Sequence, residues 1–351
     1  MDILSEVLRI VRLSGVVHFR AELREPWGIL SSPPEMLITR VMPGAESVTP
    51  FHVLYEGGCL VQSGALPPVR FEIGDVVVFP RGDQHVLLSD AGVTPVPVKD
   101  IYPKVSAEHI SIVRHGGGGA PTGLICGFLH SDQRFGPLLE SLPTLLCIRS
   151  RGSALTIECL SADKRETHTV TRQHEAEWWQ GSLRYFINES RAPSTGSRAV
   201  LARLSELLFM EVMRWQLRHA TDERRGWLAG LNDPTVGRAL SLLHAEPARA
   251  WTVDTLAGEA ATSRTVLAKR FADLVGETPM QYLTAWRMHL ARHLLRETSL
   301  GLGEIAGRVG YESEAAFNRA FRRNAGSPPA RWRDAGHQED ETAEEGRRAA
   351  G

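Results

Sequence analysis

Residues 256–279 read LAGEAATSRTVLAKRFADLVGETP, and residues 305–329 read IAGRVGYESEAAFNRAFRRNAGSPP, so one pattern occurs twice. In each copy an apolar residue and an alanine precede a serine, an apolar pair at i and i+4, a glycine and a proline. The matching residues are Leu256, Ala257, Ser263, Leu267, Phe271, Gly276 and Pro279, and Ile305, Ala306, Ser313, Phe317, Phe321, Gly326 and Pro329.

Each copy predicts a helix-turn-helix. A first helix ends near Ala260 or Val309, and a small residue, Ala261 or Gly310, permits a tight turn. The serine then caps a second helix whose apolar pair faces the core, and the glycine marks the helix end. The alternative is a plain helical bundle with a chance repeat, but it does not explain why serine, glycine and proline recur in step.

Pro279 is a favourable first residue for a helix that joins the two copies and ends near Glu297. Such a helix is about 28 Å long at 1.5 Å per residue, close to the ~34 Å of one DNA turn. When they are joined in this way, the second helix of each copy can enter one of two successive major grooves.

The stretch from Asp233 to Arg333 resembles the DNA-binding domain of the AraC family of transcription regulators. That family's fold is two helix-turn-helix units joined by a long helix. The second copy carries the more specific match, at Ile305, Ala306, Val309, Gly310, Tyr311, Ser313, Phe317, Arg319, Ala320, Phe321, Arg322, Gly326, Ser327, Pro328, Trp332 and Arg333.

Side chains that read bases must lie on the outer face of each second helix, out of phase with the apolar pair. The positions that satisfy this condition, and that match the base-reading positions of the family, are Thr265, Ala268, Lys269, Ala315, Asn318 and Arg319. Arg319 can fork onto a guanine, and Asn318 can pair with adenine or touch a phosphate. Ala268 offers only apolar contact, as to a thymine methyl.

Charge adds little to the DNA prediction. The chain has 40 basic and 41 acidic residues, and residues 232–334 carry a net charge of only about +3. Arg264, Arg322 and Arg323 are the expected phosphate contacts, the alternative for each being a solvated surface charge.

The first 160 residues predict an all-β sandwich or barrel, because short β-rich segments alternate with Pro and Gly. Their resemblance to the cupins, carried by the motifs below, implies a cupin-like barrel. The expected strands include Met36–Val41, Phe51–Tyr55, Val69–Ile73, Val76–Phe79 and Gly123–Leu129. Residues 74–85, GDVVVFPRGDQH, fit the second cupin motif, although Ser89 replaces its usual final asparagine. The first motif survives only in part, with His52 present, Leu54 in place of the second histidine and Cys59 in place of the glutamate.

Two barrel histidines and two cysteines, His52, Cys59, His85 and Cys126, make a candidate closed zinc site. The alternative is that these are satisfied core histidines and small buried cysteines. Loss of the motif's glutamate and second histidine disfavours an open, oxygen-activating iron site.

Two helices, at residues 172–189 and 198–219, are expected after the barrel, and their apolar stripe either packs on the core or forms a homodimer seam. The predicted organisation is a multidomain α+β chain: a sensor at 1–160, a helical hairpin and linker at 161–230, an all-α double helix-turn-helix domain at 231–334, and a disordered tail at 335–351.

These features predict a transcription regulator that binds double-stranded DNA, contacts RNA polymerase and senses an unidentified small molecule, metal or redox signal. Four cysteines without paired spacing, no apolar leader and no stretch of ~20 apolar residues predict a cytoplasmic protein with no membrane partner. The competing class is a cupin metal-dependent oxygenase or isomerase with a helical appendage, which the broken first motif disfavours.

Overall fold

The computed structural model describes residues 3–11, 13–40, 45–102, 110–131, 136–151, 153–162, 164–219 and 226–334. These residues form two compact units, each described here by itself. The described residues from 13 to 218 form one, which we call the sheet unit. The described residues before and after them form the other, which we call the helical unit.

The sheet unit is built on an eight-stranded sheet and a five-stranded sheet. The larger has the order β13-β12-β11-β6-β3-β10-β1-β9, with bounds Lys164–Val170, Ala154–Ser161, Leu145–Arg151, Val76–Val78, Ser47–Glu56, Pro121–Ser131, Ser14–Arg24 and Ser111–Gly116. The smaller has the order β5-β4-β7-β2-β8, with bounds Val69–Glu72, Gly58–Ser63, His85–Leu88, Gly28–Leu30 and Val96–Pro97. Three short helices lie in the connections, α2 (Pro34–Arg40), α3 (Val98–Ile101) and α4 (Gly136–Glu140).

Apolar side chains from both sheets form one buried core, which includes Phe19, Trp27, Leu54, Phe71 and Phe79. Strand β1 alternates between buried and partly exposed side chains along its length, as a strand with one face on a core does. The expected sheet-rich region is therefore confirmed.

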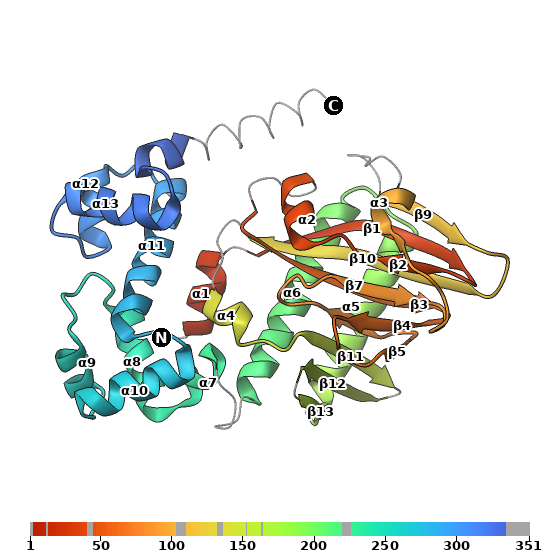
Figure 1. Cartoon of the computed structure of the whole chain (residues 1–351), viewed down its shortest axis with the longest axis horizontal. Helices are drawn as coiled ribbons and strands as arrows, with labels where there is room; N and C mark the ends of the chain where they lie inside the picture. The colour runs from red at the N-terminus through yellow and green to blue at the C-terminus, as the bar shows by residue number, and fades with distance from the viewer. Residues whose placement is uncertain are drawn as a thin grey trace. The chain divides into compact units, whose positions relative to one another are not determined.

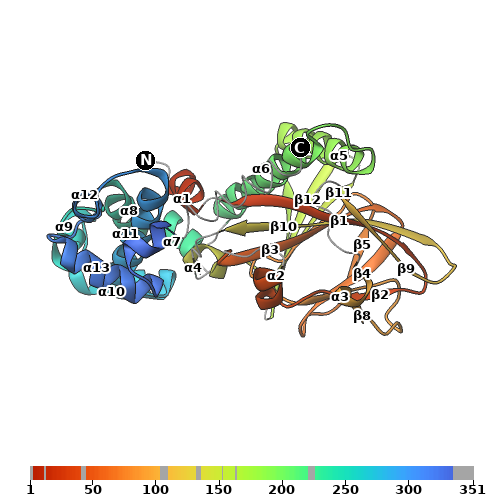
Figure 2. The ribbon, with the colours of Figure 1, turned by 90° about the horizontal axis from the view of Figure 1, so that it is seen from above.

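Two long helices, α5 (Gln173–Arg191) and α6 (Ser197–Arg218), lie along the outer face of the larger sheet (Figure 2). Their close approach needs a small residue at Gly15, whose added Cβ would lie 2.5 Å from the Ala202 carbonyl oxygen. The Gly15 amide also donates a 3.0 Å hydrogen bond to the Glu206 carboxylate. Phe51 of the sheet meets Phe186 of α5 with 6.2 Å between ring centroids.

The helical unit contains eight labelled helices and, among the described residues, a further helical segment at 329–334 (Figure 1). The labelled helices are α1 (Ile3–Val11), α7 (Trp227–Asn232), α8 (Pro234–Ala245), α9 (Val253–Glu259), α10 (Arg264–Val275), α11 (Pro279–Glu297), α12 (Leu302–Arg308) and α13 (Glu314–Ala325). Helices α9 and α10 are the first predicted helix-turn-helix, α12 and α13 are the second, and α11 is the joining helix with its predicted bounds.

The local signals that predicted these helices act as expected. The Ser263 hydroxyl accepts a hydrogen bond from the Val266 amide at 3.3 Å, and Ser313 does the same for Ala316 at 3.2 Å. Gly276 and Gly326 end the helices in the left-handed conformation, with φ of 87° and 74°.

Helix α1 packs in the helical unit through a buried polar chain. The Glu6 carboxylate lies 3.0 Å from His244 Nδ1, and His244 Nε2 lies 2.7 Å from the Tyr282 hydroxyl. That hydroxyl also accepts a 2.8 Å hydrogen bond from the indole of Trp227. The expected sensor domain of residues 1–160 therefore differs from the observed unit at its start, because α1 contacts helices far away in sequence.

Two other expectations differ from the structure. The segment predicted as a strand at Met36–Val41 is helix α2 over its described part. The segment expected as a helical hairpin and linker at 161–230 includes Trp227, which is fully buried in α7, so the helical unit begins before Leu231. Residues 220–225 and the predicted tail at 335–351 lie outside the described residues. No described helix is both long and apolar enough to cross a membrane.

Candidate functional site

The outer face of α10 carries the first set of predicted base-reading residues. Thr265 and Lys269 are exposed, and Ala268 between them is partly exposed. On the opposite side of the same helix, Leu267 and Phe271 are completely buried. The phase predicted from the apolar spacing is therefore the phase observed.

Helix α13 repeats this arrangement. Ala315 and Arg319 are exposed, Asn318 is partly exposed, and Phe317 and Phe321 are completely buried beneath them. The expected phosphate contacts are also at the surface, with exposed side chains at Arg264, Arg322 and Arg323.

The two outer faces differ in charge. On α10, Lys269 Nζ lies 2.6 Å from the Asp273 carboxylate. Arg264, at the start of that helix, lies 3.1 Å from the carboxylate of Asp254 in α9. On α13, by contrast, none of the three arginines forms an ion pair with a residue in the described part of the chain. The second face therefore offers uncompensated positive charge to an anionic partner.

Two side chains near these faces escaped the sequence prediction. Val266 on α10 is 50% exposed. The sequence does carry a signal for this surface position, because Val266 is an apolar residue out of phase with the buried Leu267 and Phe271. Arg270 forms an ion pair with Asp233, the residue that caps α8. The sequence alone does not separate such a structural arginine from a DNA contact.

Helix α11 fixes the two helix-turn-helix pairs to each other. Its Arg287 donates to the carbonyl oxygens of Pro247 at 2.7 Å and Arg249 at 2.8 Å, which lie between α8 and α9. The same guanidinium lies 5.9 Å from the ring centre of Tyr311, just after α12. Burial lowers the pKa of Arg287. These contacts hold the spacing between α10 and α13.

The predicted metal ligands of the sheet unit form a hydrogen-bonded chain. His85 Nδ1 lies 2.9 Å from the Asp83 carbonyl, which can only accept, so this nitrogen carries the hydrogen. His85 Nε2 then accepts from His52 Nε2 at 2.7 Å. His52 Nδ1 accepts in turn from the thiol of Cys126 at 3.0 Å.

Burial keeps this chain neutral. It lowers the pKa of His85 to about 4 and the pKa of His52 well below its usual value, to which the nearby His85 also contributes. Burial also raises the pKa of the Cys126 thiol. Three neutral groups therefore satisfy one another, as in the alternative of core histidines.

The expected zinc set of His52, Cys59, His85 and Cys126 does not fit this geometry. A shared zinc needs one nitrogen from each histidine and the sulfur atoms directed at a single point. His52 instead turns different ring nitrogens towards His85 and Cys126. Among the described residues, no group of three or more His, Cys, Asp or Glu side chains could hold a metal ion.

The fold and these surfaces define a class of protein, in which a sheet-rich domain precedes a double helix-turn-helix. Comparison with known families agrees, since residues 2–169 and 165–218 match a cupin family. Residues 256–335 match a helix-turn-helix domain family.

Relatives match along nearly the whole chain. The transcriptional regulator AlkR of Acinetobacter baylyi is 30% identical over 95% of this chain and 99% of its own. A Streptomyces antibioticus protein named as an AraC-like transcription regulator is 31% identical over 95% of this chain and 98% of its own. The DNA-binding domain of AdpA, solved with a target DNA, is 35% identical over 29% of this chain and 92% of that domain, with a TM-score of 0.28.

This chain belongs to the AraC family of transcription regulators. Residues 256–335 of the helical unit match the family's DNA-binding domain, and the sheet unit lies within the cupin domain that precedes it.

Proposed function

We propose that the chain is a signal-responsive regulator whose sheet unit binds an effector while its two helix-turn-helix pairs enter successive major grooves. The observation that carries this proposal is the pair of serine-capped helices with exposed outer faces, joined by one helix of 19 residues. At 1.5 Å per residue that helix is about 28 Å long, close to the ~34 Å repeat of the duplex.

The bases are read by the residues on these faces. Arg319 forks onto a guanine, Asn318 pairs with an adenine, and Thr265 and Lys269 act in the other groove. The apolar contacts, from Ala268, Ala315 and the exposed Val266, suit thymine methyl groups. Arg264, Arg322 and Arg323 contact phosphates and set the register without reading sequence.

DNase footprinting on the DNA upstream of the protein's own gene tests this arrangement. We expect two protected segments on one face of the duplex, their centres about 10 base pairs apart. Binding should weaken steeply with salt, because phosphate contacts release counterions. A single protected segment would show that only one helix-turn-helix pair engages DNA.

A second copy of this chain is the proposed partner of the α5–α6 hairpin. Trp178 and Tyr185, seven residues apart on α5, are 41% and 50% exposed, and Val200 and Leu207, seven apart on α6, are 41% and 46% exposed. The same apolar patch on two copies can form a two-fold symmetric interface. Leu207→Glu should convert a dimer to a monomer in sedimentation equilibrium, whereas Arg203→Glu, one turn away, should not.

The proposal also includes an effector, RNA polymerase as a partner and a cytoplasmic location. A regulator bound beside a promoter acts on RNA polymerase, so we propose polymerase as a second macromolecular partner. Sharing a compartment with the chromosome places the protein in the cytoplasm. No enzymatic role is proposed, since the full-length relatives named above are transcription regulators.

Zinc is not part of this proposal, because His52 directs its two nitrogens at different partners. Elemental analysis of protein purified without chelator tests this choice. Stoichiometric zinc that is lost in both Cys59→Ser and His85→Ala would restore the site predicted from the sequence.

A further inference from the structure

A cavity of about 400 Å³ lies between α5 and α6 and strands β12 and β13, outside the core between the two sheets. Its volume falls within the range of pockets that hold drug-sized molecules. It belongs wholly to the sheet unit, and neither the DNA surfaces nor the histidine chain uses any of its residues. Trp178, at its edge, also belongs to the proposed dimer surface.

The apolar part of the cavity wall is aromatic and aliphatic. Three tryptophans line it, Trp178, Trp179 and Trp215, and aliphatic side chains complete the apolar surface, namely Leu155, Ile157, Val170 and Val212. Trp178 remains 41% exposed although it is a large apolar side chain at the edge of the cavity. Indole rings favour flat aromatic partners, which stack against them or meet them edge to face.

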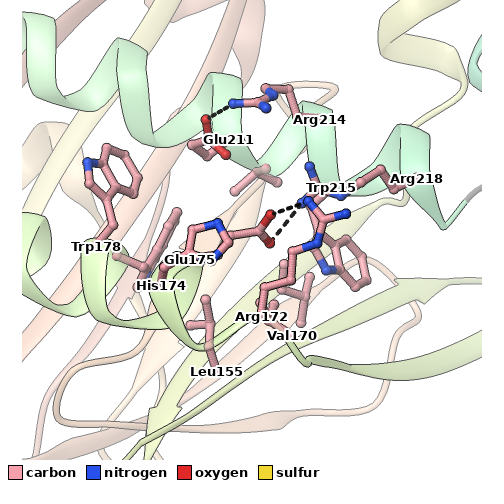
Figure 3. Close-up of a pocket in the computed structure, with 13 residues that line it drawn as sticks. Leu155, Val170, Arg172, His174, Glu175, Trp178, Glu211, Arg214, Trp215 and Arg218 are labelled. Carbon is pink, nitrogen blue, oxygen red and sulfur yellow. Dashed lines mark hydrogen bonds and ion pairs between the residues drawn. The ribbon is translucent and has the colours of Figure 1, made fainter.

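One end of the cavity is charged (Figure 3). The Glu175 carboxylate lies between two arginines, 3.3 Å from Arg172 and 3.0 Å from Arg218. Glu211 and Arg214 form a separate, balanced pair. Two arginines share one carboxylate, so among the described residues that line this end one positive charge is uncompensated.

A second space adjoins the cavity. A smaller apolar space of about 30 Å³ between the helices and the larger sheet shares Trp179 and Val212 with it. The indole nitrogen of Trp179 is buried and has no hydrogen-bond partner in the described part of the chain. A buried donor without an acceptor destabilises the fold, so a ligand atom that accepts from it gains a favourable hydrogen bond.

We propose that this cavity binds a flat aromatic molecule that carries one anionic group. The tryptophans stack on the ring system, and Arg172 and Arg218 bind the anion in competition with Glu175. Arg218 is the last residue of α6, and the next described helix along the chain, α7, belongs to the DNA-binding unit. This inference rests on the proposed sensor function and supplies its ligand class and site.

Two fluorescent dyes test the site on the full chain without DNA. Anilinonaphthalene sulfonate is a flat aromatic anion, and phenylnaphthylamine is the same ring system without the sulfonate. We expect one saturable site per chain, with the anion bound about tenfold more tightly because it gains a charge-assisted hydrogen bond.

Opposite shifts from two variants separate ligand binding from a structural role. Arg218→Gln should weaken the anion about tenfold and leave the neutral dye unchanged, whereas Glu175→Gln should strengthen the anion by releasing both arginines. Trp178→Ala should weaken both dyes. The matched controls are Arg203→Gln on α6 and Ile187→Ala on α5, neither of which lines the cavity.

Equal affinity for the two dyes, or pocket variants that match their controls, would overturn the inference. Circular dichroism establishes that each variant is folded before its affinity is compared. Footprinting in the absence of dye reports separately on DNA binding. A negative dye result with an intact footprint therefore removes this ligand site and leaves the DNA-binding function in place.

Discussion

The two helix-turn-helix pairs share the same arrangement of helices but differ in charge, capping and turn geometry. Lys269 on α10 and Arg264 at its start are paired with Asp273 and Asp254, whereas the arginines of α13 have no such partners among the described residues. Helix α9 begins with a reciprocal capping box at Thr252, and α12 begins at Gly301 without a side-chain cap. The basic side chains of the first pair are thus neutralised by nearby carboxylates, whereas those of the second pair are better placed to bind an anionic partner.

The turns of the two pairs differ in the residue with positive φ and in what lies beside it. Both need a residue with positive φ, which is Ala261 at 54° in the first pair and Gly310 at 80° in the second. Gly310 lies against Ala248, in the connection between α8 and α9, so the second turn is part of the contact between the two pairs. A side chain is tolerated only where the turn has no such neighbour.

The largest expected effect comes from Gly310→Ala. Its Cβ would lie 2.7 Å from the Ala248 carbonyl oxygen and 2.6 Å from Arg287 Nη2, in addition to the unfavourable φ. We expect the helical unit to lose about 3 kcal/mol of stability. Hydrogen exchange in the full chain measures this loss, with Gly307→Ala as the control, because a Cβ there meets nothing within 4 Å. Equal protection in both variants would show that the second turn does not hold the pairs together.

The next effect concerns DNA reading. Arg319→Ala should cost about 1–3 kcal/mol on a specific site and relax preference at one base, because no described residue forms an ion pair with this side chain. Lys269→Ala should cost less than about 1 kcal/mol, since Asp273 already neutralises the ammonium. Fluorescence anisotropy with single-base variants of the operator compares the two. A larger loss in Lys269→Ala would reverse the proposed division between the pairs.

The repeat and its joining helix could be predicted from the sequence because their signals are local. Ser263 and Ser313 cap helices, Gly276 and Gly326 end them, and Pro279 starts one, all within a few residues of the structure they determine. The same holds for the turn at Gly74 and the placement of His85 at the start of a strand.

The features that escaped prediction depend on distant partners. The sequence of α1 is amphipathic, but only the fold brings Glu6 to His244 and Tyr282. Trp227 was assigned to a linker because nothing nearby in sequence shows its burial. The four candidate zinc ligands were chosen by residue type, and the direction of each His52 nitrogen depends on three strands meeting in space.

A smaller effect should follow from Asp273→Asn, which makes the first pair resemble the second. Releasing Lys269 and removing a negative charge from the DNA-facing surface should tighten DNA binding by about 1 kcal/mol. The dependence of log affinity on log salt should also steepen by about one unit, as for one added phosphate contact. Glu246→Gln, which breaks an ion pair with Arg249, is the matched control. Unchanged salt dependence would mean that Lys269 does not reach the DNA.

The smallest effect is expected from Ala261→Gly, which gives the first turn the residue of the second. A left-handed φ destabilises the folded state by about 1–2 kcal/mol at an alanine, and glycine removes this strain. Glycine also has greater freedom in the unfolded chain, which lowers the stability by about 0.5–1 kcal/mol. The net expectation is a stabilisation of about 0.5 kcal/mol, seen as slower hydrogen exchange in α9 and α10. Ala272→Gly, inside α10, should act in the opposite direction by about 1 kcal/mol. If Ala261→Gly instead destabilised these helices, packing of the alanine methyl would outweigh its backbone strain. The two turns would then differ in their own packing as well as in the residues that surround them.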